Sequence, residues 1–592
     1  MIVAMKKVFL LIQHANGPAA LERLRQLGVV HVEHESVPSG QELSELNEKL
    51  NLIEQARSVL SGADQKHRSQ LAAHKPEDWI IICRHVIDLA KRYGQLKEYA
   101  VSLRLGIDFW KHWGDFDPGQ IKSLQQKNVQ IKFYQIPKEK IKSLPPEILF
   151  QEISRQGQLL NCLSVSIGNI DLGFKEIELP KLSLSQMKHR LEEDASVMQD
   201  IREEIARHLV FEKELVAAEE RFLDQKDFYT VLKGMGQAGE FIYLKGYIPV
   251  DAEAMLIQQA KICGWGILTL KPSPDDAVPT LVRNPAWVKL IQPLLKLLEI
   301  VPGYKELDIS PLFLIFFSLF FGMIIGDAGY GLLYFVITFV VDKKVGKKMK
   351  DKNPIFLFYV LSSCAIIWGI ISGTFFGQAW LVKLGIKPLV PSLSDISFVQ
   401  AFCFLIGAIH LTIAHSWRMS LKLPALIALA DLGWISIIWA AFFLAKNLLL
   451  GDQFPFFGRW LIWTGISLVI LFTNPQRNVL KGIGEGVAAI ALGLVNNFTD
   501  VISYVRLFAV GLAGVAIADA FNMMAAGNSG AKGLGELIAG LLILIAGHTL
   551  NFILGPMSVL VHGVRLNVLE FCSHANVSWS GFEYKPFSKK GK

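Results

Sequence analysis

The sequence predicts an α+β cytoplasmic domain with a long antiparallel helical hairpin and two small α/β lobes, followed by an all-α membrane domain of eight helices. Two observations predict this organisation. Apolar residues make up 51% of the 592 residues and the mean hydropathy is +0.35, which is too hydrophobic for an ordinary soluble protein of this size. Charged residues are unevenly spread, because residues 1–310 contain 80 of the 113 Asp, Glu, Lys and Arg residues, whereas residues 311–580 contain only 28.

Several classes of function are disfavoured by the composition. The net charge of +7 needs no nucleic acid as a partner, because the lysines cluster beside apolar spans, where membrane topology already predicts them. The six cysteines form no C-x-x-C pair, which argues against a zinc site or a disulfide framework. No G-x-x-x-x-G-K-[ST] phosphate loop occurs, so we expect no nucleotide site and no cofactor. The N-terminal apolar run is too short for a signal peptide, which predicts a cytoplasmic N-terminal half.

The predicted cytoplasmic domain covers residues 1–305. Its basal lobe, over about 1–40 and 230–300, begins with a strand (KKVFLLIQ, 6–13), a helix (ALERLRQLGV, 20–29) and a second strand (VVHVEHE, 29–35). EFIYLKGYIPV (240–250) and the helix after it are expected to complete this lobe.

A helical hairpin is predicted over about 41–104 and 185–229, with a distal lobe of mixed strands and helices over about 105–184. Leucine and isoleucine recur at three- and four-residue steps among charged residues after residue 43, as in a coiled coil. A second such helix covers residues 189–222. The hairpin is interpreted either as a solvated structural rod or as a docking arm for another coiled coil.

The membrane domain is predicted over residues 306–580. Apolar runs cover roughly 311–342, 354–378, 399–417, 424–446, 459–473, 486–526 and 534–575. The first run would form a helix of about 48 Å, too long for one upright span. In its middle, FFGMIIGDAGYGLL (320–333) places four glycines around Asp327, which can cap a helix start. This pattern predicts two short spans joined by a tight hairpin.

Lysine placement predicts the topology. The six lysines of VDKKVGKKMKDKN (341–353) indicate a cytoplasmic loop. The loops over 418–424 and 474–482 and the tail over 581–592 are also expected inside, and those over 379–398, 447–458 and 525–533 outside. Eight spans with cytoplasmic N- and C-termini follow, which predicts a multi-pass protein of the cell membrane.

The last two helices, over about 488–526 and 534–575, are long enough to require strong tilt or extension beyond the bilayer. Each carries an intramembrane polar stripe, and each stripe contains an arginine, Arg506 or Arg565. The other members of the stripes are Asn496, Asp500 and Ser503 on the first helix and His548, Asn551, Ser558 and His562 on the second.

Most of these residues also have a structural interpretation. The serines can bond their own helix, the asparagines can join helices, His562 can be a core histidine and Asp327 a hairpin cap. Glu485 and Glu570 are expected near the cytoplasmic surface, where a carboxylate can be solvated. Arg565 and Glu570, five residues apart, are not well aligned on an ideal helix. Arg506 is hardest to explain structurally, because Asp500, the nearest carboxylate in its helix, is six residues away.

Several stretches resemble subunit I (subunit a) of bacterial and archaeal V/A-type rotary ATPases. They are PTLVRNPAWVKLIQPLLKLLEIVPGYKELD (279–308), FFGMIIGDAGYG (320–331), DVISYVRLFAVGLAG (500–514) and VHGVRLNVLEF (561–571). One departure is DISP (308–311), where the family usually has D-P-T-P. The resemblance extends over most of the chain, although its specific motifs lie after about residue 279.

The resemblance implies a membrane stator subunit that forms H⁺ or Na⁺ half-channels against a rotor ring whose small subunits carry ion-binding carboxylates. Arg506 and Arg565 would face those carboxylates. The cytoplasmic half-channel candidates are Asn496, Asp500, Ser503, Glu485 and Glu570, and the external candidates are His548, Asn551, Ser558, His562 and Asp327. The arm would bind coiled-coil peripheral stalks, and the central-stalk adaptor would be contacted only indirectly.

Two other functions are compatible with a membrane domain of this kind. A secondary ion-coupled transporter or channel would act alone, but the spans show no obvious internal repeat and the soluble half is large for that class. A membrane tether without an ion path would have no use for two arginine stripes. Co-purification with ring and stalk subunits would distinguish a stator from a transporter.

Overall fold

The computed structural model describes most of the chain in two compact units. The described residues are 1–62, 79–138, 149–168, 173–349, 351–377, 388–476, 479–527 and 534–589. One unit comprises Met1–Phe9, Val29–His31 and Gly246–Pro586, and the other comprises Leu10–Gly28, Val32–Lys245 and Phe587–Lys592. The predicted loops 379–398 and 525–533 and the predicted tail 581–592 lie partly outside the described residues. The predicted boundaries at residues 305 and 580 stay predictions.

The elements expected for the basal lobe form at the expected places, together with two strands, at 236–238 and 266–270, that the sequence did not predict. They are β1 (Met5–Gln13), α1 (Gly17–Leu27), β2 (His31–Glu33), β7 (Gly236–Ala238), β8 (Phe241–Pro249), α7 (Glu253–Cys263) and β9 (Gly266–Leu270). The strand order is β2-β8-β1-β9, and β7 pairs with β8. Helix α1 ends at Gly28, whose φ of 63° is the left-handed conformation that glycine adopts without strain.

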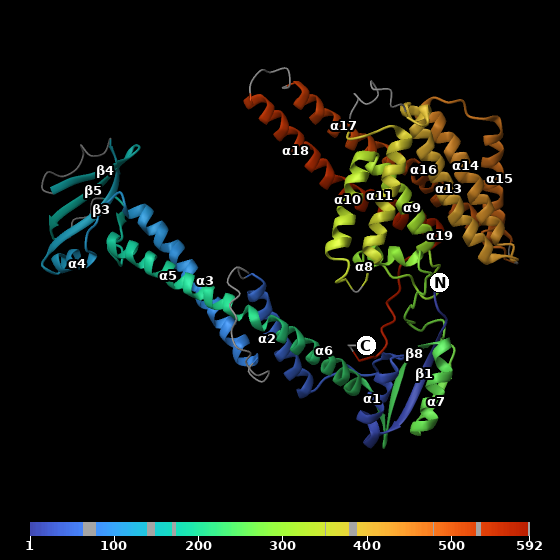
Figure 1. Ribbon diagram of the computed structural model, residues 1–592, viewed down its shortest axis with the longest axis horizontal. Helices are drawn as coiled ribbons and strands as arrows, with labels where there is room; N and C mark the ends of the chain where they lie inside the picture. Colours follow the sequence, from blue (N-terminus) through green and yellow to red (C-terminus); the bar gives the residue numbers. More distant parts are fainter. Residues whose placement is uncertain are drawn as a thin grey trace. The chain divides into compact units, whose positions relative to one another are not determined.

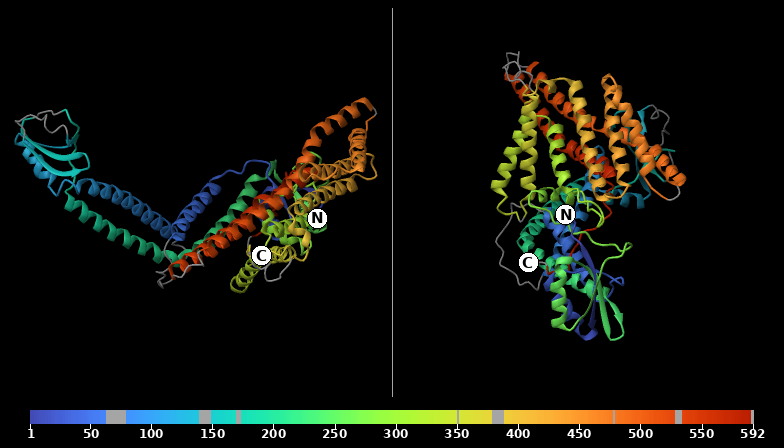
Figure 2. Two further views of the ribbon diagram at one scale, coloured as in Figure 1. Left: turned by 90° about the horizontal axis from the view of Figure 1, so that it is seen from above. Right: turned by 90° about the vertical axis from the view of Figure 1, so that its right-hand side faces the viewer.

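Four long helices form the arm: α2 (Gln41–Ser61), α3 (Trp79–Trp110), α5 (Leu184–Arg207) and α6 (Glu212–Gly234). Helix α3 packs against α5 and α2 packs against α6, so two helical pairs follow one another (Figures 1 and 2). Buried apolar side chains from these helices, including Ile53, Val86 and Ile205, form a shared core. Helix α5 begins with a capping box between Ser183 and Gln186, which satisfies backbone donors at its start.

The distal lobe is a four-stranded sheet with a short helix beside it (Figure 1). Its elements are α4 (Pro118–Gln126), β3 (Val129–Pro137), β4 (Leu149–Gln156), β5 (Leu159–Ile167) and β6 (Glu176–Ile177). The strand order is β4-β5-β3-β6. Strands β3 and β5 are antiparallel, with Val129 opposite Ile167 and Pro137 opposite Leu159. The mixed α/β character predicted for the N-terminal region is thus confirmed.

The long apolar run after residue 310 folds as the predicted helical hairpin. Helix α9 (Ser310–Ile325) ends at Gly326, whose φ is 65°. Helix α10 (Ala328–Lys344) begins after Asp327, whose Oδ1 accepts hydrogen bonds from the backbone N–H groups of Gly329 (2.8 Å) and Tyr330 (3.1 Å). The turn therefore forms because a glycine takes the left-handed position and an aspartate caps the next helix.

The rest of this region is helical. The further helices are α11 (Asn353–Ser372), α13 (Ile396–Lys422), α14 (Ala428–Leu450), α15 (Phe456–Phe472), α16 (Val479–Ser503), α17 (Val505–Gly527) and α18 (Leu534–Ser558). Within the described residues, five segments are long and apolar enough to cross a membrane, and α9 and α15 are shorter apolar helices. The count of eight spans stays a prediction.

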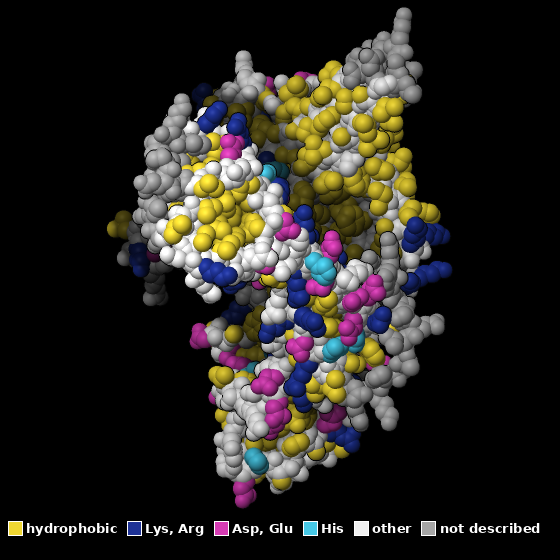
Figure 3. All heavy atoms as spheres, turned by 90° about the vertical axis from the view of Figure 1, so that its left-hand side faces the viewer, with side chains coloured by type: hydrophobic (Ala, Val, Ile, Leu, Met, Phe, Trp, Pro, Cys, Tyr) yellow, Lys and Arg dark blue, Asp and Glu magenta, His cyan; other side chains and the backbone are white. Residues whose placement is uncertain are grey.

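The outer faces of these helices expose apolar side chains. Leu537, Leu542 and Ile545 on α18 are all more than half exposed. At the top right of Figure 3, hydrophobic side chains form a broad surface with few charged side chains among them. A surface of this kind is suited to lipid or to another membrane subunit.

The last two long helices, Leu480–Ala526 and Leu537–Ala575, each contain a local departure from α-helical hydrogen bonding. Helix α16 ends at Ser503 and α17 begins at Val505, with a tighter turn in which Tyr504 N–H donates to the Val501 carbonyl (3.4 Å). After α18, two π-helical stretches (Val559–Gly563 and Leu566–Phe571) precede α19 (Cys572–Ala575). Pro556 lies just before the first π-helical stretch. Because it has no N–H donor, it interrupts the α-helical hydrogen-bond pattern there.

The C-terminal segment is held against residues 303–306. Glu306 accepts hydrogen bonds from the backbone N–H groups of Gly303 (2.7 Å), Ser578 (2.9 Å) and Trp579 (3.2 Å). Burial raises the pKa of Glu306, but these bonds and one from the Ser578 hydroxyl outweigh it and leave the pKa below its usual value. The segment after α19 is therefore anchored by an ionised carboxylate.

Candidate functional site

The two arginines of the predicted stripes meet at one buried carboxylate. Arg506, at the start of α17, places Nη1 3.5 Å from Glu570 Oε1, and Arg565 places Nε 3.6 Å from the same oxygen. The Glu570 side chain is only 4% exposed, whereas those of Arg506 and Arg565 are 23% and 53% exposed. The expectation of a solvated Glu570 was therefore wrong, because the residue is enclosed by packing against helices distant in sequence.

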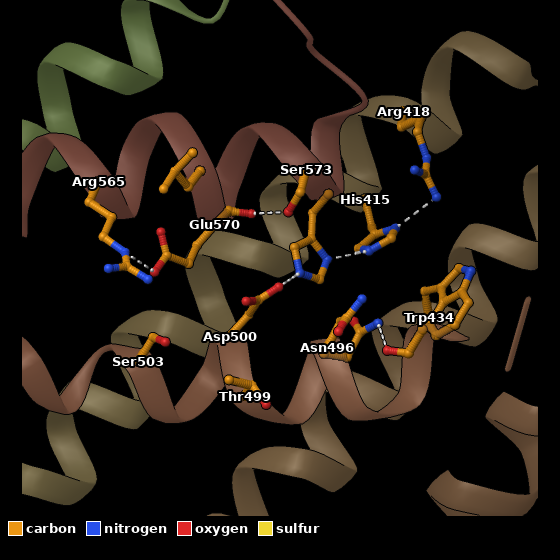
Figure 4. A pocket seen from close by; sticks show the side chains of 14 residues that line it. His415, Arg418, Trp434, Asn496, Thr499, Asp500, Ser503, Arg565, Glu570 and Ser573 are labelled. Atoms are coloured by element: carbon orange, nitrogen blue, oxygen red, sulfur yellow. Dashed lines mark hydrogen bonds and ion pairs between the residues drawn. The ribbon is translucent and has the colours of Figure 1, made fainter. Parts of the chain in front are cut away.

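The π-helical stretch explains how Arg565 reaches Glu570. In an α-helix, residues five apart diverge around the axis, which is why the sequence does not favour this pair. A π-helix closes its hydrogen bonds between residues i and i+5 and brings such residues onto one face. Because Leu566–Phe571 is π-helical, the two side chains point toward each other (Figure 4).

A cavity of about 590 Å³ adjoins this pair. Its polar and charged lining comes from α13, α16 and the end of the chain's last helical segment: His415, Arg418, Asn496, Asn497, Thr499, Asp500, Ser503, Arg565, Glu570, Ser573 and His574. Figure 4 shows Asn496, Asp500 and Ser503 on one helix, opposite Arg565, Glu570 and Ser573 on another. The structure thus brings together four of the five residues predicted for the cytoplasmic side.

A chain of hydrogen bonds crosses the wall of this cavity. Asp500 Oδ2 lies 3.0 Å from His574 Nε2, and His574 Nδ1 lies 2.9 Å from His415 Nε2. Arg418 Nη2 lies 3.2 Å from His415 Nδ1. His415 Nδ1 also lies 3.3 Å from Asp431 Oδ1, so it can accept from Arg418 or donate to that carboxylate.

Asp431 of α14 anchors the far end of this chain. It is fully buried, and it accepts hydrogen bonds from Arg418 Nε (2.6 Å) and Lys422 Nζ (2.7 Å). The sequence interpretation missed Asp431, His415 and His574. The available signal was their position inside apolar runs, because an ionisable residue at membrane depth is by default a functional candidate.

A second polar cluster lies farther along the same two long helices. The Tyr330 hydroxyl is 2.6 Å from His548 Nδ1, and His548 Nε2 is 3.0 Å from Asn522 Oδ1. Asn551 Nδ2 donates to the Gly514 carbonyl (2.9 Å). Tyr330, Asn551 and Ser558 line a smaller cavity of about 120 Å³, together with apolar side chains from α9, α17 and α18.

Arg506 lies between the two cavities along the chain. The larger cavity is lined by α16 as far as Ser503, and the smaller one by α17 from Val510 onward. On the last helical segment the smaller cavity ends at Ser558 and the larger begins at Arg565. In sequence, Arg506 thus lies between the two linings, and Arg565 belongs to the lining of the larger cavity.

Five predicted residues lie outside both linings: Arg506 and His548, described above, and Asp327, Glu485 and His562. Asp327 caps α10, and its second oxygen accepts from the Gly377 N–H (3.0 Å), so its carboxylate is occupied by backbone donors. Glu485 Oε2 accepts from Asn474 Nδ2 (2.6 Å) in the turn before α16. His562 lies half-buried in the first π-helical stretch. These contacts favour the structural interpretation of Asp327.

Comparison with known proteins decides the family. The chain is 31% identical to V-type ATP synthase subunit I of Borreliella burgdorferi over 623 aligned residues, which cover all of both chains. It belongs to the family of V-type ATP synthase subunit I.

Other comparisons are weaker. The chain is 28% identical to V-type ATP synthase subunit I 1 of Treponema pallidum, with full coverage of both chains. It is 26% identical to A-type ATP synthase subunit I of Methanocaldococcus jannaschii over 80% of this chain and 71% of that one. A solved cytoplasmic N-terminal domain of subunit I aligns with 45% of this chain at 16% identity and a TM-score of 0.28. No family model matches the chain.

Proposed function

We propose that the chain is the membrane stator of a V/A-type rotary ATPase and that it forms the two half-channels through which H⁺ or Na⁺ reaches a rotor ring. The observation that carries this proposal is the meeting of Arg506 and Arg565 at Glu570, beside a polar cavity of about 590 Å³. The chain has no catalytic role of its own in this proposal and acts within the complex.

The arginines supply the electrostatic step. A guanidinium does not deprotonate at accessible pH, and its rigid fork suits a carboxylate. When a ring carboxylate rotates up to Arg506, the positive charge favours its ionised form and displaces the bound proton or cation. The same charge blocks direct leakage from one cavity to the other, so that ion flow requires rotation of the ring.

Each cavity serves one half-channel. The larger one, with Asn496, Asp500, Ser503 and Glu570, is the cytoplasmic half-channel, to which Glu485 is also assigned although it lies outside the cavity lining. The smaller cluster around His548, Asn551 and Ser558 is the external half-channel. This assignment rests on the predicted topology, with both termini in the cytoplasm and the helices in the cell membrane.

The N-terminal arm is the proposed attachment site of the peripheral stalks. A stator must be held against the torque that the ring exerts on it. Two successive helical pairs with a lobe at the end provide an extended surface for coiled-coil subunits. The central-stalk adaptor would be contacted only indirectly.

The test is ATP-driven ion transport by the complex in vesicles carrying Arg506→Ala. We expect coupled transport to be abolished while ring and stalk subunits still co-purify. Arg459→Ala, at an exposed arginine of α15, is the matched control and should transport normally. Normal coupled pumping by Arg506→Ala would refute the role.

A secondary transporter or channel acting alone is the second candidate, because two cavities at membrane depth also suit such a protein. It predicts ion transport by the purified chain in vesicles without other subunits. A stator alone would not transport ions, and sodium dependence measured with the whole complex would identify the ion.

A further inference from the structure

The single negative charge of Glu570 balances only one of the two arginine charges, and neither arginine forms a hydrogen bond with it. Its Oε1 is shared between Arg506 Nη1 and Arg565 Nε at 3.5 and 3.6 Å, which are ion-pair rather than hydrogen-bond distances. Within the described residues, both Glu570 Oε2 and Arg506 Nη1 are buried and form no hydrogen bond. The site thus holds two fixed positive charges, one negative charge and unused hydrogen-bonding capacity.

As the rotor ring turns, there are intervals in which no ring carboxylate faces the two arginines. Loss of its partner destabilises the mostly buried charge of Arg506, because that charge has lost hydration and gained nothing in return, whereas Arg565 is 53% exposed. If nothing compensated the arginines, each departing carboxylate would leave that penalty behind. The rotor would then stop wherever a carboxylate paired with them most tightly.

The loose geometry is suited to exchange. A bidentate arginine–carboxylate pair with two short hydrogen bonds would be strong and slow to open. Glu570 is instead at ion-pair distance from Arg506, whose side chain is 23% exposed and forms no hydrogen bond to it. A ring carboxylate can therefore take over Arg506 without first breaking short hydrogen bonds.

We propose that Glu570 is a resident counter-ion that holds Arg506 and Arg565 between successive ring carboxylates and yields Arg506 when one arrives. This inference rests on the proposed stator function and deepens it. In it Glu570 is a positioning residue that acts through its negative charge. It does not relay protons, so what matters is the local balance of two positive charges against one negative charge.

Charge balance can be tested with a double variant in the assembled complex. Glu570→Gln leaves two uncompensated arginines, and we expect ATP-driven transport to fall about tenfold or more. Arg565→Gln combined with Glu570→Gln restores the original net charge of +1, and we expect it to recover at least about threefold over Glu570→Gln alone. Glu583→Gln, at an exposed carboxylate outside the helical region, is the matched control for the chemical change.

The outcomes separate the counter-ion from a proton relay. A relay needs the carboxylate itself, so a double variant as impaired as Glu570→Gln, or more so, would overturn the proposal. Normal transport by Glu570→Gln would also overturn it. If Glu570→Gln fails to assemble, the yield of complex that co-purifies with the ring becomes the measurement, and the double variant should restore it. If Arg506→Ala abolishes transport but the double variant does not recover it, only the counter-ion role of Glu570 is refuted. Normal transport by Arg506→Ala refutes the stator function.

Discussion

Around the larger cavity the polar side chains carry charges of both signs, whereas those lining the smaller cavity are neutral. Asp500, His574 and His415 line the larger cavity and are joined by hydrogen bonds. Next to them, the buried Asp431 binds Arg418 and Lys422. The polar residues lining the smaller cavity are two tyrosines, an asparagine and a serine. The charged cavity also has the larger volume, about 590 Å³ against about 120 Å³ for the neutral one.

This difference indicates two ways of building an aqueous path. A wide cavity with a prearranged charge network can hold water and ions without a partner, because its charges are already compensated within the chain. A narrow neutral cavity offers only isolated hydrogen-bonding groups. We therefore expect the external path to be completed by the surface of the rotor ring, and the cytoplasmic one to exist in the subunit by itself.

The largest effect is expected from Asp431→Asn. This change removes the negative charge that Arg418 and Lys422 share, and we expect the free energy of unfolding in detergent to fall by about 3 kcal/mol. Asp452→Asn, at a half-exposed carboxylate paired with Lys446, should change it by less than about 0.5 kcal/mol. Equal losses for the two variants would show that the charge network does not hold the larger cavity together.

A smaller effect is expected from His574→Ala. The change removes the link between Asp500 and His415, and losing hydrogen bonds to a charged group should lower ATP-driven transport about tenfold. His574→Gln keeps a donor toward Asp500 and should retain more activity than the alanine variant. His189→Ala, at an exposed arm histidine, is the control. Unchanged transport by His574→Ala would remove the histidine chain from the path.

The smallest effect is expected from Tyr330→Phe beside the narrow cavity. It removes one neutral hydrogen bond to His548, worth about 1 kcal/mol, so transport should fall by no more than about fivefold. The initial rate of ion uptake by vesicles measures this directly. If Tyr330→Phe lowered transport more than His574→Ala does, the neutral smaller cavity would contribute more to transport than the charged larger one.

The helical hairpin at Gly326 and Asp327 and the polar character of the last two helices could be predicted from local patterns. A glycine with positive φ next to a capping aspartate is specified by neighbouring residues. The burial of Glu570 could not be predicted in this way. A carboxylate near the end of a long apolar helix has the same sequence pattern whether it is solvated or enclosed, and the π-helical backbone that aligns it with Arg565 has no clear local signature.

The residues that the sequence interpretation missed share one property. His415, Asp431 and His574 have as partners side chains from other helices, with His415 and His574 separated by 159 residues and His574 and Asp500 by 74. Helical periodicity assigns each to a face, but it does not identify the helix that packs against that face.

The amino-acid sequence by itself determined the division into a charged arm and an apolar helical region, and it determined that two arginines lie within apolar helices. Composition and short-range spacing are sufficient for both, because the hydrophobic effect acts on each segment separately. Only the tertiary structure decided that both arginines share Glu570 and that a histidine pair joins Asp500 to Arg418 and Asp431. Ion pairs and hydrogen bonds depend on distances of a few ångströms between residues far apart in the chain, and packing alone sets those distances.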